Sequence, residues 1–135
     1  MERSEKLPPN CPPREAEEAS GEVYRLVNKN PPVAKDFLSW YESKPEMTYE
    51  DRSKECQAHG LSVYNQKSSI LSLLKRIPTL RKNKKVALGR LTPDLGVMLN
   101  TPSNEDKLHY TWWVAVGKEP WTVFQVVDID KCEEL

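Results

Sequence analysis

The order of its short apolar segments constrains the fold of this chain more than any other feature. Two segments repeat apolar residues at intervals of three and four positions, which predicts helices with one buried face. They contain Ala34, Phe37, Leu38 and Tyr41, and then Ile70, Leu73, Leu74 and Ile77. Pro45 and Pro78 are expected to end these helices. The other segments are rich in β-branched and aromatic residues and predict strands at 23–27, 61–64, 84–92, 97–99, 108–116 and 121–129.

In chain order, these segments give the pattern β-α-β-α-β-β-β-β. The pattern predicts an α+β fold with a mainly antiparallel C-terminal sheet. The last two predicted strands are separated by residues 117–120 and have the spacing of a hairpin. The polar stretch 43–56 carries mixed charge, and we interpret it as a long loop or a short frayed helix.

The chain of 135 residues fits one domain, which we predict to cover residues 22–129. Residues 1–21 contain four prolines and almost no bulky apolar side chain, so burial cannot offset the entropy lost on ordering. We therefore expect 1–21 to be a disordered tail rich in proline and glutamate, with a tether for a partner as the alternative. Residues 130–135 are expected to form an acidic C-terminal tail.

Composition excludes several classes of protein. No run of 18 apolar residues is present, so no membrane-spanning helix is expected, and the first residues do not resemble a secretory signal. The cysteines are Cys11, Cys56 and Cys132; an odd, widely spaced set predicts reduced thiols in the cytoplasm. The 20 basic and 20 acidic residues cancel, which excludes a uniformly basic polyanion-binding protein.

The zero net charge conceals one basic segment. No acidic residue lies between Glu55 and Asp94. The cations of this stretch include Arg76, Arg81, Lys82, Lys84 and Lys85. One interpretation is a solvated helix end, where cations complement the helix dipole. The other is a contact site for an anion or a nucleic acid, because clustered lysines and arginines neutralise phosphates and release counterions.

Large aromatic side chains concentrate on the last two predicted strands. They are Tyr110, Trp112, Trp113, Trp121 and Phe124. Alternation along a strand sends Trp112 and Trp113 to opposite faces. Because a domain of this size needs only a few large aromatic residues in its core, we expect one of the tryptophans to be half exposed. Such aromatic residues either pack across neighbouring strands or form a stacking platform or an anchor for a partner.

Cys56 and His59 form half of a metal-binding motif, which His109 and Cys132 would have to complete. Two thiolates and two imidazoles suit tetrahedral zinc, and Cys56 with either histidine is an alternative nucleophilic dyad. The second pair is separated by 23 residues, so we expect no metal. We interpret these residues as buried thiols and hydrogen-bonded histidines.

The first predicted strand carries Tyr24-Arg25, and the second reads Gly60-Leu61-Ser62-Val63-Tyr64. With a helix after each, this order resembles the core of ADP-ribosyltransferase-like proteins, in which an early Arg, a central Ser and a late Glu serve the reaction. The resemblance implies binding of NAD, with Arg25 at the phosphates and Ser62 supporting the pocket. The late strand here contains Gln125 and no Glu two residues on, so the catalytic Glu of the family has no counterpart there.

Two functional hypotheses follow. The first is a small non-catalytic binding module, without a cofactor, that contacts a protein or nucleic-acid partner through a basic turn and an aromatic strand surface. Its expected contact residues are Arg76, Arg81, Lys82, Lys84, Lys85, Trp112 and Trp113. The alternative is a nucleotide-dependent transferase that uses NAD, with Arg25, Ser62 and His109 lining a cleft.

Overall fold

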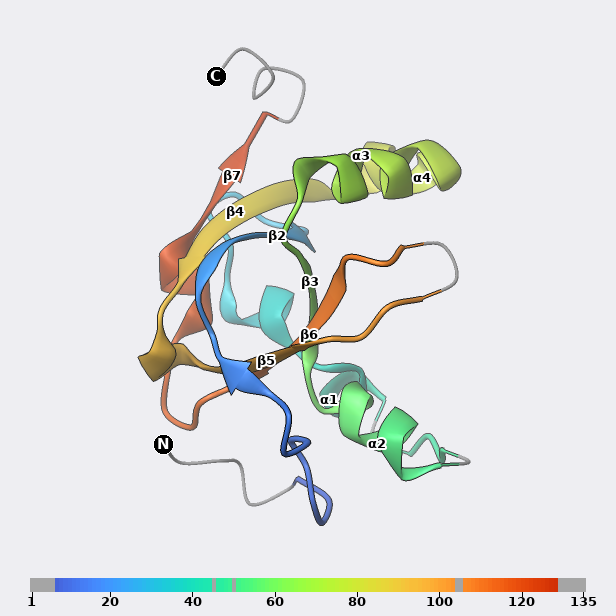
Figure 1. Ribbon diagram of the computed structural model, residues 1–135. Helices are drawn as coiled ribbons and strands as arrows, with labels where there is room; N and C mark the ends of the chain where they lie inside the picture. The colour runs from blue at the N-terminus through green and yellow to red at the C-terminus, as the bar shows by residue number, and fades with distance from the viewer. Residues whose placement is uncertain (1–6, 45, 50, 104–105, 129–135) are drawn as a thin grey trace.

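The computed structural model of the protein describes residues 7–44, 46–49, 51–103 and 106–128 (Figure 1). Its central feature is a seven-stranded sheet in the order β1-β5-β6-β3-β2-β4-β7, in which all neighbouring strands are antiparallel. The strands are β1 Glu17–Glu18, β2 Gly21–Val27, β3 Leu61–Tyr64, β4 Lys85–Leu91, β5 Gly96–Asn100, β6 His109–Val114 and β7 Phe124–Val127. The predicted α+β class is confirmed.

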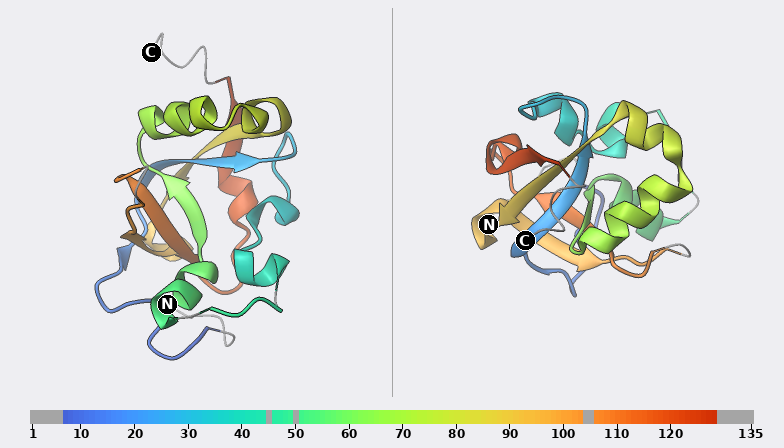
Figure 2. Two further views of the ribbon diagram at one scale, coloured as in Figure 1. Left: turned by 90° about the vertical axis from the view of Figure 1, so that its right-hand side faces the viewer. Right: turned by 90° about the horizontal axis from the view of Figure 1, so that it is seen from above.

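Short helices connect the strands and gather at two ends of the sheet. The α-helices are α1 Trp40–Ser43, α2 Arg52–Ala58, α3 Lys67–Arg76 and α4 Pro78–Asn83, and the 3-10 helices are η1 Ala34–Phe37, η2 Pro93–Leu95 and η3 Pro120–Val123. The left view of Figure 2 shows α3 and α4 across one end, with α1 and α2 near the other. Within the described ranges, no helix is both long and apolar enough to cross a membrane.

The main core is built from alternate positions of the central strands. Val23, Val63, Ala87 and Trp112 are fully buried and pack in one cluster with Phe124. Because successive strand residues point to opposite faces, the residues between them face the other side of the sheet. There, α3 covers the sheet with a second, smaller cluster that consists of Ile70, Leu74 and Val86.

The second predicted helix is present and ends just before Pro78, as expected, but another short helix follows directly. α3 ends at Arg76, and Pro78 takes the first position of α4. Proline is tolerated there because the first turn of a helix does not use its backbone N–H. The first predicted helix is instead divided into η1 and α1. The division falls at Ser39, whose hydroxyl accepts the Glu42 N–H at 3.1 Å while the Glu42 carboxylate accepts the Ser39 N–H at 2.9 Å.

The predicted hairpin between the last two strands is wrong. β7 pairs with β4 at one edge of the sheet, whereas β6 lies between β5 and β3. The strand also begins at Phe124, because residues 120–123 form η3. Gly89 allows this pairing: a Cβ at Gly89 would lie 2.6 Å from the Phe124 ring, so only a residue without a side chain leaves room for it.

Residues 7–20, which we call the N-terminal strap, belong to the folded domain and differ from the predicted tail. β1 pairs with β5, and Ala19 is fully buried and donates its N–H to Gly96 at 2.9 Å. A disulfide joins Cys11 to Cys56, with Cα atoms 5.6 Å apart, so the prediction of reduced thiols is wrong for this pair. The composition predicted disorder because bulky apolar side chains are rare in this segment. The segment is instead held in place by one disulfide and one strand pairing. Predicted tail segments 1–6 and 130–135 lie outside the described residues.

Candidate functional site

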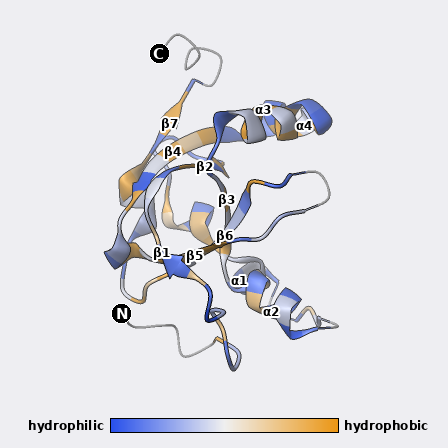
Figure 3. Cartoon of the chain, in the orientation of Figure 1, coloured by the Kyte–Doolittle hydropathy of each residue, from blue (hydrophilic) through white to orange (hydrophobic). Residues whose placement is uncertain are grey.

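The basic face is the outer surface of α3, α4 and the start of β4. Its exposed cations are Lys75, Arg76, Arg81, Lys82 and Lys85. Figure 3 shows hydrophilic residues on both helices. The predicted contact residue Lys84 is half-buried, and its Nζ donates to the Asn28 side chain at 2.9 Å. Four of the five predicted cations are therefore exposed on these consecutive elements, and Lys84 also makes a hydrogen bond within the fold.

Trp112 and Trp113 are not surface residues, which corrects their predicted role as partner contacts. Their exposed fractions are 0% and 2%. Trp112 donates its indole N–H to the Leu95 carbonyl at 3.0 Å, and Trp113 donates to the Cys56 carbonyl at 2.9 Å. Both faces of β6 are therefore buried, the second because Leu7, Cys11 and other strap residues pack against Trp113.

The Arg25 side chain connects β2 to η1 and β3. Its guanidinium donates to the Ser62 carbonyl at 2.8 Å and to the Asp36 carbonyl at 3.2 Å, and it lies 5.4 Å from the centre of the Phe37 ring. Burial lowers the pKa of Arg25 to about 10, although the nearby Asp36 opposes this change. The Asp36 carboxylate accepts the backbone N–H groups of Asn28 and Val33, so it orders the loop after β2.

Ser62 and His109 form a hydrogen-bonded pair on neighbouring strands. His109 Nε2 lies 2.9 Å from Ser62 Oγ, and its Nδ1 lies 2.9 Å from the Thr101 carbonyl oxygen. A carbonyl oxygen can only accept a hydrogen bond, so in the neutral ring Nδ1 carries the proton and Nε2 accepts from the serine hydroxyl. The Thr101 carbonyl therefore orients the imidazole toward Ser62.

Arg25 and His109 reach Ser62 from opposite faces of the sheet. Arg25 lies two positions from both Val23 and Val27, so it shares the face of β2 that packs in the main core. It contacts only the backbone oxygen of Ser62. The exposed Ser62 side chain points away from that core, because its neighbour Val63 points into it. The three residues are thus connected by hydrogen bonds, but none of them lines the apolar cavity described below.

Three of the four residues of the zinc hypothesis make other contacts in the described part of the chain. Cys56 is in the disulfide, and the His59 ring stacks on Tyr41 with ring centres 3.9 Å apart. His109 contacts Ser62 and Thr101, and Cys132 lies outside the described residues. Among the residues that the structure describes, no group of three or more histidine, cysteine or acidic side chains could hold a metal ion.

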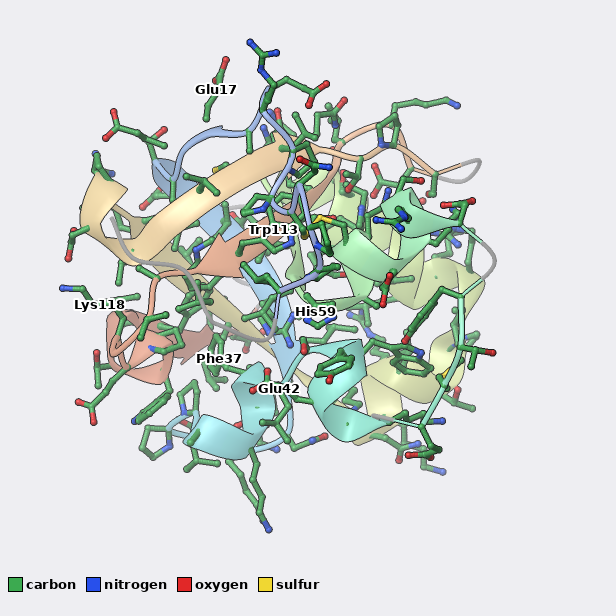
Figure 4. The ribbon with its side chains drawn as sticks, turned by 90° about the horizontal axis from the view of Figure 1, so that it is seen from below. Glu17, Phe37, Glu42, His59, Trp113 and Lys118 are labelled. Carbon is green, nitrogen blue, oxygen red and sulfur yellow. A yellow bond between two sulfur atoms is a disulfide. The ribbon has the colours of Figure 1, made fainter. Side chains whose placement is uncertain are left out.

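An apolar cavity of about 390 Å³ opens between the strap, α1 and the end of β6. Its apolar lining includes Leu7, Phe37, Leu61, Trp113 and Trp121. Figure 4 shows Phe37, Glu42, His59 and Trp113 around this region and Lys118 at its side. The lining residues come from segments that are far apart in the sequence, so no local pattern predicts the cavity. The only sequence signal is the Ser39–Glu42 spacing of a capping box, which places Glu42 at the start of α1.

Comparisons of the chain with protein-family models, with curated proteins and with solved structures found no match. The basic face, the Ser62 contacts and the cavity are therefore the candidate functional features of the described chain.

Proposed function

We propose that the protein is a binding module that contacts a polyanionic partner, a nucleic acid, through its basic face. The observation that carries this proposal is the clustering of five exposed cations on adjacent helices and the strand that follows them. No acidic residue occurs in the sequence from 56 to 93. Asp128, which follows β7, borders the face where it lines one pocket with Arg81 and Lys85. A surface of this kind attracts phosphates and gains free energy from the release of their counterions.

The face is suited to phosphate contact rather than to base recognition. The aromatic residues nearest to it, Tyr24 and Tyr64, are partly buried and pack against Ile70 and Leu74 beneath α3. Without an exposed aromatic side chain for base stacking, affinity has to come from charge and depends little on sequence. The binding constant should therefore fall steeply as the salt concentration rises. A plot of its logarithm against the logarithm of the salt concentration should have a slope of about −0.9 for each phosphate neutralised.

The experiment compares two variants with the same change in net charge. The first variant replaces Arg76, Lys82 and Lys85 on the basic face with glutamate. The control variant replaces Lys35, Arg52 and Lys54, which are exposed elsewhere, also with glutamate. Arg81 is left intact because it has a contact within the protein. Affinity for a fluorescent DNA duplex of mixed sequence is measured over a range of salt concentrations.

We expect the basic-face variant to bind DNA much more weakly than the wild type and the control to keep most of its affinity. The salt slope of the variant should fall by about three if each cation neutralises one phosphate. Equal affinities for the two variants would remove the proposal. Binding of polyglutamate in place of DNA would assign the face to an acidic protein instead.

A nucleotide-dependent transferase is the second candidate function, and the observation that favours it is the hydrogen bond between His109 and the Ser62 hydroxyl. In that function, Arg25 would have to release one of its two carbonyl acceptors to reach a phosphate. NAD should then raise the thermal midpoint of the wild type and not that of Ser62→Ala. No shift with NAD at saturating concentration would remove this candidate.

The cytoplasmic location is a separate proposal, which the disulfide disfavours. Disulfides persist mainly in oxidising environments, and Cys11–Cys56 fixes the strap to the domain. The state of the bond in cell extracts prepared under alkylating conditions tests the location. A fully alkylated pair would support a reducing compartment.

A further inference from the structure

The apolar cavity has the size and lining of a small-molecule site. Its volume of about 390 Å³ lies within the range of roughly 300–1,000 Å³ that is typical of ligand pockets. Four aromatic side chains contribute to its walls: Phe37, Tyr41, Trp113 and Trp121. Walls of this kind favour a flat apolar group, since aromatic rings pack well edge to face or offset.

The polar groups of the cavity give it a negative character. Lys118 contributes an ammonium group, but this group pairs with Asp94 at 3.5 Å. Burial lowers the pKa of His59, although Glu55 and Glu42 oppose this, so its imidazole is uncharged at neutral pH. Glu42 is the acidic side chain of the lining, and no cation among the described residues forms a salt bridge with it.

Glu42 is fixed in position while keeping capacity for a ligand. One carboxylate oxygen, Oε1, accepts the Ser39 N–H at 2.9 Å and holds the start of α1. An ionised carboxylate has about four acceptor sites, so this single hydrogen bond leaves the others for a donor that enters the cavity. The capping contact therefore orients the charge before any ligand arrives, which reduces the entropy cost of binding.

We propose that this cavity binds a small aromatic amine, with its ring between the aromatic walls and its ammonium group at Glu42. The cation gains a charge-assisted hydrogen bond from the carboxylate, and aromatic faces nearby attract it further. An anionic analogue meets the Glu42 carboxylate and an uncharged His59, and the ammonium group of the lining, Lys118, is already paired with Asp94. A neutral analogue keeps the ring contacts and loses the ion pair.

The test uses three probes of similar shape and different charge: 2-phenylethylamine, 2-phenylethanol and 3-phenylpropionate. Binding is followed by the intrinsic tryptophan fluorescence, because Trp113 and Trp121 both line the cavity. The wild type should bind the amine about tenfold more tightly than the alcohol and should bind the acid most weakly.

The decisive variant is Glu42→Gln, which removes the charge but retains an oxygen that can cap α1. Glu46→Gln is the matched control, since Glu46 is exposed and does not line the cavity. We expect Glu42→Gln to bind amine and alcohol equally and Glu46→Gln to behave as the wild type. Equal binding of all three probes by the wild type, or no binding, would overturn the proposal, as would an amine preference that survives in Glu42→Gln.

Discussion

Replacing Cys11 and Cys56 with serine tests how far the disulfide stabilises the domain. The two cysteines lie 45 positions apart. In the chain-entropy model, a cross-link that closes a loop of this length removes about 4 kcal/mol of unfolded-state entropy at room temperature. We therefore expect the free energy of unfolding of the double variant to fall by about 4 kcal/mol, a large part of the stability of a typical domain.

The assay is urea unfolding followed by tryptophan fluorescence, because Trp113 is buried beneath the strap. Wild-type protein treated with a dithiol reductant should match the double serine variant, and Cys132→Ser should match the untreated wild type. Thiols are counted in the unfolded, unreduced chain, where one free thiol is expected from the three cysteines. Three free thiols, or a double variant as stable as the wild type, would refute the reasoning.

Three further predictions concern the fold. Arg25→Met removes two hydrogen bonds from a charged donor and should destabilise the domain by about 3 kcal/mol in urea unfolding; an unchanged midpoint would show that water replaces the guanidinium. Gly89→Ala brings a Cβ to 2.6 Å from the Phe124 ring and should cost about 1–3 kcal/mol, part of which Phe124→Leu should restore. Burial lowers the pKa of His59, so the unfolded chain takes up the proton first as pH falls below 6.5, and acidification should destabilise the wild type more than His59→Asn. Parallel pH profiles for the two proteins would contradict this last expectation.

The sequence pattern correctly predicted the helices and strands whose formation depends mainly on local sequence. The strands at 61–64 and 84–92 and the buried face of Ile70 and Leu74 follow from periodicity. The strand order did not follow, because pairing between distant segments is decided by packing. Only the three-dimensional fit of Phe124 over Gly89 explains why β7 joins β4 instead of β6.

The candidate sites were predictable to different degrees. The basic face follows from sequence, since adjacent cations on short helices remain exposed. The burial of Trp113 does not follow from the sequence, because the N-terminal strap is what covers it. A disulfide holds the strap in place, and the odd number of cysteines had predicted reduced thiols. The cavity is lined by Leu7, Glu42 and Trp121, which come from three distant regions of the chain. A local sequence pattern cannot predict that these regions lie close together.

The two edges of the sheet have a consequence for self-association. The outermost strands are β1, with two residues, and β7, with four. An edge this short offers few unpaired backbone groups to another chain, which is one way in which natural sheets avoid aggregation. β1 also places the exposed carboxylates of Glu17 and Glu18 along its edge, so like charges repel a second copy. Release of the strap would uncover the five-residue edge of β5, so we expect reduction of the disulfide to favour intermolecular sheets.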